Sequence, residues 1–274
     1  MTKMHSRSTK GASPYMAWMV LFTAIPLLLV IYFAFTDSGG RPTLSNLTGL
    51  GNYSTVFFLS LVMAVIATLV CLVIGYPISF MLSRLRGGQQ GILLMLVMLP
   101  MWMNFLLRTY AWMSLLERGG LINRFLGVFG VGPLDMINTS GAVVLGMVYN
   151  YLPYMILPLY TAMHKIDNAV IEAAEDLGAG LWKKLTRVLL PMSKQGIQTG
   201  ITMVFVPSIS TFIISKMLGG GNFWLIGDLI ESQFLGNSYN YNLGSAMSLV
   251  LMVVVLLCMS LTGGFDQEEI EGVL

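Results

Sequence analysis

Side chains that could form a catalytic or metal-binding site are few and scattered in this sequence. The two histidines, His5 and His164, and the two cysteines, Cys71 and Cys258, have no partners at the spacings of metal ligands or redox pairs. No GxxxxGKS or GxxxxGKT motif is present to hold the phosphates of ATP. The sequence therefore predicts no catalytic residue, no metal site and no cofactor bound by this chain. A net charge of +2 gives no reason to expect a nucleic-acid partner.

The segment 164–196 has the most regular pattern of polar and small residues. Asp167 and Asn168 are candidate N-caps of a helix, and Gly178 permits a turn through positive φ. A second helical piece follows from Leu181 to Leu190, and Pro191 is expected to close it. The pattern predicts a compact helix–turn–helix that could fit the groove of a partner. The alternative is a solvated linker whose charges anchor it to lipid headgroups.

The composition indicates the class of protein to which this segment belongs. Hydrophobic residues make up 55% of the 274 residues and charged residues only 10%. A soluble domain usually has about a quarter charged residues, so too few are present to cover a surface that faces water. The sequence therefore predicts an all-α integral membrane protein with a surface in contact with membrane lipid.

Six apolar runs are long enough to cross a bilayer, which needs about 20 helical residues. Most of them contain proline, which membrane bundles tolerate and which predicts kinks. The first run is too long for a cleavable signal sequence and is expected to remain. We expect one transmembrane domain, 1–274, with spans at 15–35, 56–82, 92–116, 141–163, 197–217 and 243–263.

The distribution of lysine and arginine predicts that both chain ends lie in the cytoplasm. Three basic residues then fall in outer loops, namely Arg41, Arg118 and Arg124. Ten fall in cytoplasmic segments, namely Lys3, Arg7, Lys10, Arg84, Arg86, Lys165, Lys183, Lys184, Arg187 and Lys194. The acidic tail 266–274 is the one feature that runs against this orientation.

Two further features stand out among the spans and outer loops. Arg108 lies well inside a span, where a charge is costly, so it is expected to pair with a carboxylate of another subunit or to extend to an interface. The segment 223–234 has apolar residues at helical spacing and acids on another face. It predicts a short amphipathic helix that lies at the outer surface or enters the bundle.

The segment 164–196 resembles the EAA signature of permease subunits of ATP-binding-cassette (ABC) importers. That signature has E-A-A, a glycine four residues later and I-x-L-P after nine more. Here Glu172, Ala173, Ala174 and Gly178 match it, and 188–191 departs only in having valine for isoleucine. The resemblance implies a type I importer permease fold. It also implies that Glu172, Ala173, Ala174, Leu177 and Gly178 couple the chain to an ATPase.

Other segments resemble the spermidine/putrescine branch of these permeases, and the resemblance covers about 15–261. They are 100–102, 108–110, 117–123, 149–153 and 225–227. Permeases for ferric iron, thiamine or sulfate remain alternatives. The resemblance implies a multi-pass protein of the bacterial cytoplasmic membrane. Its partners would be an ABC ATPase dimer that binds ATP and Mg²⁺, a sister permease, an extracytoplasmic solute-binding protein and a small cationic substrate.

A polycationic solute would need acidic groups and aromatic faces along its path. The candidate acids are Asp228, Glu231, Glu117 and Asp135, and the candidate rings are Trp112, Tyr149, Tyr151 and Tyr154. The alternative assigns these acids to loop solvation and these rings to interfacial belts.

Two other classes of function fit the sequence less well. An ion-coupled secondary transporter would be expected to carry ionisable groups in several spans, but apart from Arg108 the spans have almost none. A membrane-embedded enzyme would need a cluster of catalytic side chains near the membrane surface, and the sequence shows no such cluster.

Overall fold

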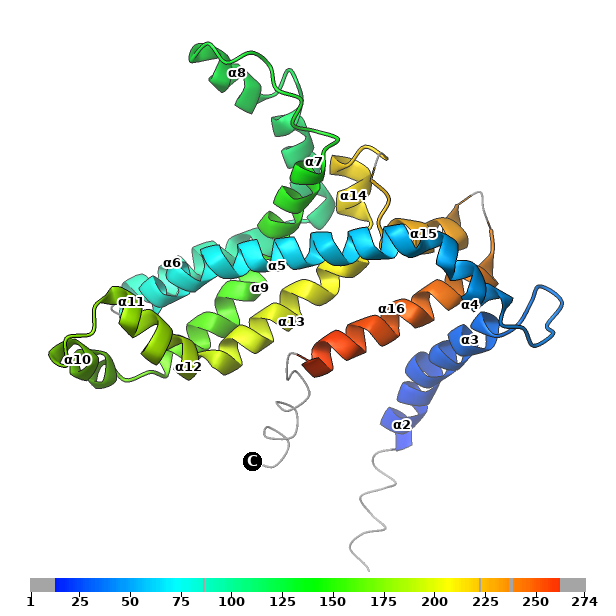
Figure 1. Ribbon diagram of the computed structural model, residues 1–274, viewed down its shortest axis with the longest axis horizontal. Coiled ribbons are helices and arrows are strands. Elements are labelled where there is room, and N and C mark those ends of the chain that lie inside the picture. Colours follow the sequence, from blue (N-terminus) through cyan, green and yellow to red (C-terminus); the bar gives the residue numbers. More distant parts are fainter. Residues whose placement is uncertain (1–12, 86, 222, 237–238, 262–274) are drawn as a thin grey trace, which may run out of the picture. The chain divides into compact units, whose positions relative to one another are not determined.

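The computed structural model describes residues 13–85, 87–221, 223–236 and 239–261, which are helical almost throughout (Figure 1). Their contacts group the chain into two compact units, Met1–Ser54 with Leu229–Val254, and Thr55–Asp228 with Val255–Leu274. Several residues used above lie outside the described residues, namely Lys3, His5, Arg7, Lys10, Arg86 and the acidic tail 266–274.

The first unit begins with a continuous apolar helix that occupies the predicted span 15–35. It consists of α2 (Ser13–Met19), a π-helical turn η1 (Val20–Ala24) and α3 (Ile25–Ala34). The wide turn directly precedes Pro26, which has no N–H to donate to residue 22. Pro26 thus accounts for a local widening of the helix, and the kink predicted for this span stays a prediction.

The rest of the first unit surrounds the end of α3. It contains α4 (Ser45–Gly49), the 3₁₀ turn η2 (Leu50–Tyr53), the later part of α15 (Ile226–Leu235) and the first part of α16 (Tyr241–Leu261). Two asparagine amides satisfy carbonyls at the end of α3: Asn46 Nδ2 donates to the Ala34 oxygen at 3.2 Å, and Asn242 Nδ2 donates to the Phe33 oxygen at 3.1 Å. Both amides also donate to the Thr36 oxygen, just beyond the helix.

The second unit is built on three long helices, α5 (Ser54–Ser83), α9 (Ser140–His164) and α13 (Lys194–Ser210). α9 and α13 lie side by side (Figure 1). Glycines on α13 allow this approach, since Gly200 lies against Met155 and Gly196 against Pro158. Membrane helices commonly associate through such small residues, because lipid gives no hydrophobic drive for helices to pack together.

α5 joins this pair through polar and small side chains. Ser79 Oγ donates to the Ile156 oxygen of α9 at 3.0 Å, and the Cys71 thiol approaches the Val148 oxygen at 3.8 Å. The predicted spans 56–82 and 141–163 thus correspond to α5 and α9. Both helices keep their internal prolines.

The predicted span 92–116 is not one straight helix. It is divided into α6 (Gly87–Trp102) and α7 (Phe105–Leu116), and α6 makes an angle of 91° with 105–128. Asn104 causes the break, because its backbone is extended and its side chain accepts from the Leu106 N–H at 2.8 Å. The segment is therefore a broken span or a re-entrant loop.

The predicted span 197–217 is also interrupted. α13 ends at Ser210, and α14 (Ile213–Leu218) begins after two residues. Among the described residues, four helices are long and apolar enough to cross a membrane, or up to five if the bent pair counts as one span. The chain is therefore a multi-pass membrane protein. The predicted number of six membrane spans stays a prediction.

Replacing Gly196 with leucine should destabilise the α9–α13 pair. A Cβ atom at Gly196 would lie 2.8 Å from the Pro158 carbonyl oxygen, which belongs to the backbone of α9 and cannot rotate away. We expect a loss of about 1–3 kcal/mol, measured as a lower melting temperature of the purified protein in detergent. Gly91→Leu is the control, because a Cβ there meets no atom within 4 Å. Equal melting temperatures would contradict the close contact.

Candidate functional site

The helix that contains the EAA-like residues is well defined at its start. α10 (Asn168–Asp176) is capped by Asp167, whose Oδ1 accepts from the Ala169 N–H at 3.0 Å. Of the two predicted N-cap candidates, Asp167 is thus the cap and Asn168 is the first helical residue.

The same helix ends at the predicted glycine. Gly178 has a φ of 74°, and its N–H donates to the Glu175 oxygen at 2.8 Å. The Ala179 N–H donates to the Ala174 oxygen at 3.0 Å. These two hydrogen bonds form a Schellman motif, in which a left-handed residue reverses the chain and satisfies the last carbonyls. Gly178 therefore fixes the turn of the helix–turn–helix.

The second helical piece follows this turn, as predicted. It comprises α11 (Leu181–Lys184), a π turn η3 (Leu185–Leu189) and α12 (Leu190–Met192). It ends one residue after Pro191 rather than before it. Helical residues continue without a break from 181 to 192, so Pro191 lies inside the helix, and the π turn η3 directly precedes it just as η1 precedes Pro26. Lys184 forms an ion pair with Glu175 across the two pieces.

The tip of this projection exposes apolar as well as acidic side chains. Leu177 is 88% exposed and Trp182 is 75% exposed. Glu172, Ala173 and Gly178 are exposed, and Ala174 is half-buried. The five residues predicted for coupling thus lie on one short exposed segment. Its apolar side chains have no cover from the described residues, as expected of a docking surface.

Arg84, at the end of α5, holds the base of the projection. Its guanidinium donates to the Ile166 oxygen at 3.0 Å, to the Met163 oxygen at 3.2 Å and to the Asn168 side chain. Burial lowers the pKa of Arg84, and the nearby Asp167 acts in the opposite direction. In the sequence, Arg84 contributed only to the prediction of how the chain is oriented in the membrane. Its role depends on three carbonyl and amide oxygens 79 to 84 residues away.

The candidate path aromatics meet in two pairs. Trp112 of α7 lies edge-to-face with Tyr149 of α9, with ring centroids 5.3 Å apart. Tyr151 and Tyr154 have centroids 6.4 Å apart. Tyr151 is buried and its hydroxyl donates to the Pro207 oxygen at 3.4 Å, whereas Tyr154 is 40% exposed. Tyr154 is therefore better placed to meet a solute, and Tyr151 joins α9 to α13.

Asp228 is buried in the first turn of α15. Its Oδ2 accepts from the Leu225 N–H at 2.8 Å, and the Ile226 N–H donates to Ser60 Oγ of α5 at 2.7 Å. The carboxylate thus caps its own helix. The amphipathic helix predicted over 223–234 enters the bundle with this first turn, and Glu231 lies one turn later, half-buried.

The other two candidate acids belong to the loop around α8 (Leu121–Val128). Asp135 forms an ion pair with Arg118, and this arginine lowers the pKa of the Asp135 carboxyl group. Glu117 is exposed at the end of α7. Buried Asn123 holds the loop, since it donates to the Glu117 and Leu134 oxygens at 3.1 and 3.0 Å. No signal in the sequence singled out Asn123.

Arg108 is buried beside the ring of Phe105, which lies 5.8 Å from its guanidinium carbon. Its Nε and Nη1 atoms have no hydrogen-bond partner among the described residues. Of the two expectations for this residue, extension to an interface does not fit its burial. Pairing with a carboxylate of another subunit stays a prediction, and it would require the buried guanidinium to become accessible.

Known proteins resemble the chain over most of its length. The "Spermidine/putrescine transport system permease protein PotB" of Haemophilus influenzae is 41% identical over 251 residues, covering 88% of this chain and 87% of the relative. The protein of the same description from Escherichia coli K12 is 38% identical over 248 residues, covering 87% and 90%.

A solved structure resembles the fold. It is a bacterial alginate ABC transporter in complex with an alginate pentasaccharide-bound periplasmic protein. The match has a TM-score of 0.80 at 15% identity and covers 97% of this chain and 96% of the other. The predicted ABC importer permease fold is thereby confirmed. The model of the family described as "Binding-protein-dependent transport system inner membrane component" matches residues 6–267, and the chain belongs to that family.

Proposed function

We propose that the chain is the permease subunit of an ABC importer that moves polyamines across the bacterial inner membrane by alternating access. It performs no covalent chemistry itself. A sister permease completes the path, two ATPase copies bind ATP and Mg²⁺, and an external binding protein delivers the solute. Both chain ends face the cytoplasm, as the distribution of lysine and arginine favours.

The observation that carries this proposal is the geometry of α10. Its EAA-like residues and Gly178 form a capped, sharply reversed knob with exposed Leu177 and Trp182. A purely solvated linker would have no need of a fixed turn or of uncovered apolar side chains. This arrangement favours docking on an ATPase over headgroup anchoring.

The polyamine assignment is supported by the descriptions of the relatives, which are spermidine/putrescine permeases at 38–41% identity. The acidic and aromatic candidates Glu231, Tyr154 and Trp112 agree with a cationic solute. Ferric iron, thiamine and sulfate are the competing solutes.

The proposal is tested by co-purifying the tagged chain in mild detergent and assaying ATP hydrolysis with binding protein and candidate solutes. A stoichiometric ATPase subunit and hydrolysis stimulated by spermidine-loaded binding protein are expected. Stimulation by another solute alone would replace the polyamine assignment. Transport by the chain alone, driven by an ion gradient, would favour the secondary transporter.

Gly178→Val should uncouple ATP hydrolysis from uptake. Valine at a φ of 74° costs about 1–2 kcal/mol, enough to disfavour the native turn by about 5–30-fold. The protein should still insert in the membrane, because the turn lies outside the spans. The measurement is the ratio of spermidine uptake to ATP hydrolysis in proteoliposomes.

Gly180→Val is the matched control for this prediction. Gly180 lies two residues away, has no positive φ, and a Cβ there meets no atom within 4 Å. It should keep a ratio close to that of the wild type. An equal loss in both variants would show that the turn geometry at Gly178 does not matter for coupling.

Asp228 allows a capping role to be separated from a solute-binding role. Asp228→Ala removes the cap of α15 and should lower the stability by about 1 kcal/mol. Asp228→Asn keeps an acceptor oxygen, so the double variant Asp228→Asn/Glu231→Gln should keep its melting temperature and raise the KM for spermidine. An unchanged KM would show that the two acids do not bind the solute and have only a structural role.

A further inference from the structure

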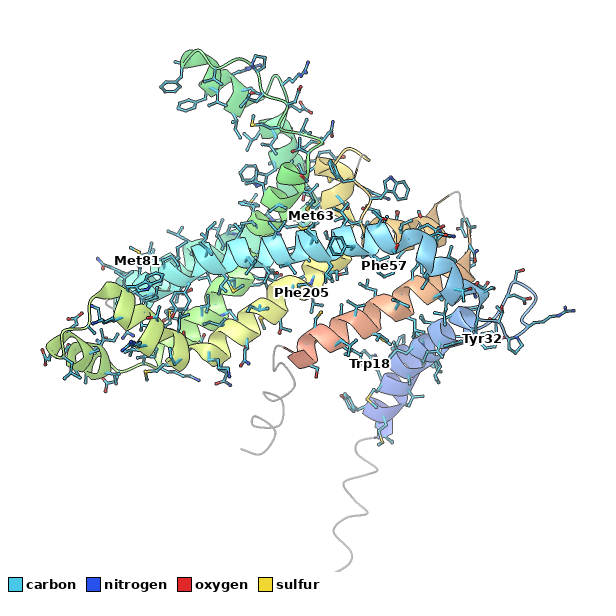
Figure 2. All side chains as sticks on the ribbon, in the orientation of Figure 1. Trp18, Tyr32, Phe57, Met63, Met81 and Phe205 are labelled. Carbon is cyan, nitrogen blue, oxygen red and sulfur yellow. The ribbon has the colours of Figure 1, made fainter. Side chains whose placement is uncertain are left out.

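A pocket of about 710 Å³ opens at the C-terminal end of α3, entirely within the first unit. Its principal lining residues are Tyr32, Asp37, Asn46, Tyr239, Tyr241 and Asn242, and we call it the tyrosine pocket. Tyr32 is labelled in Figure 2. None of these residues was among the candidates for the substrate path.

Hydrogen-bond acceptors dominate the polar lining of the tyrosine pocket. The amide nitrogens of Asn46 and Asn242 are directed to carbonyl oxygens of 33–37, which can only accept. No hydrogen bond to the side-chain oxygen of either residue is present among the described residues, so both oxygens can accept from a ligand. The C-terminal end of α3 adds the negative end of its helix dipole.

Asp37 adds a full negative charge. Its Oδ1 accepts from the Gly39 and Arg41 N–H groups, both at 2.9 Å, which fixes the carboxylate in its loop. No ion pair to Asp37 within 4.0 Å is present in the part of the chain that the structure describes. No lysine, arginine or histidine is among the lining residues.

Aromatic rings supply the other half of the lining. Tyr239 and Tyr241 meet edge-to-face with centroids 5.4 Å apart, and Tyr32 of α3 also lines the pocket. The three residues are 61%, 50% and 52% exposed, so ring faces remain open to a ligand. An ammonium group over such a face is attracted by the ring quadrupole.

An alkylammonium group matches this lining. It carries three donors and no acceptor, which complements a lining that offers a carboxylate and two amide oxygens, and its methylene chain suits the rings. An anion would find no basic side chain there. We propose that the tyrosine pocket binds a primary ammonium end of a polyamine on the outer face, as an entry site. The inference rests on the proposed polyamine function and on the orientation given above.

The test measures binding of radiolabelled spermidine to the assembled transporter in nanodiscs, without ATP or binding protein. Asp37→Asn keeps an acceptor for the loop N–H groups but removes the charge, and should weaken binding about tenfold. Asp176→Asn removes one charge at an exposed position of α10 that does not line the pocket, and should leave the affinity unchanged. Butane-1,4-diol, which lacks ammonium groups, should not compete.

A second pair of variants tests the ring faces. Tyr239→Ala should weaken spermidine binding, whereas Tyr239→Phe should retain it, because phenylalanine keeps the ring. These exposed substitutions also keep the test valid if Asp37→Asn does not fold. Equal affinities of Tyr239→Ala and wild type, with Asp37→Asn also unchanged, would overturn the proposal.

The outcomes separate this inference from the proposed function. Normal polyamine transport with unaltered spermidine binding in every pocket variant would overturn the entry site and leave the function intact. A wild-type transporter that neither binds nor transports polyamines would overturn the function itself. If Asp37→Asn weakened only docking of the binding protein, the pocket would hold a lysine of that partner, and the entry site for free solute would be wrong.

Discussion

The absence of water from the bilayer core is the constraint on which this structure depends. Polar backbone groups inside lipid must be satisfied by the chain, and every interruption of a helix needs a local solution. Side chains supply it at the breaks: Asn104 receives the first N–H groups of α7, Asn46 and Asn242 bond to carbonyls at the end of α3, and Arg84 bonds to the Met163 carbonyl in the last turn of α9.

The features that could be predicted from the sequence are those that local chemistry decides. Runs of apolar residues must be helical in lipid, so α5, α9 and α16 fall close to their predicted ranges. Asp167 and Gly178 act through their own backbone neighbours, so the start and the turn of the projection were equally predictable. The entry of α15 into the bundle was anticipated only as one of two alternatives.

The remaining features depend on partners distant in sequence. The hydropathy of 92–116 gave no sign that Asn104 would start a new helix, because apolar residues lie on both sides of it. The contacts of Arg84 and the pairing of Trp112 with Tyr149 join different helices. Neither spacing nor composition could reveal them. The same applies to the tyrosine pocket, whose walls lie about 200 residues apart in sequence.

The grip of Arg84 has a mechanical consequence. A guanidinium bound to three oxygens joins the end of α5 to the end of α9 and to the first residue of α10. The ion pair of Lys184 with Glu175 braces the far side of the same projection. Both the base and the far side of the projection are therefore tied to other helices, so a displacement of its exposed tip is expected to move the ends of α5 and α9 together.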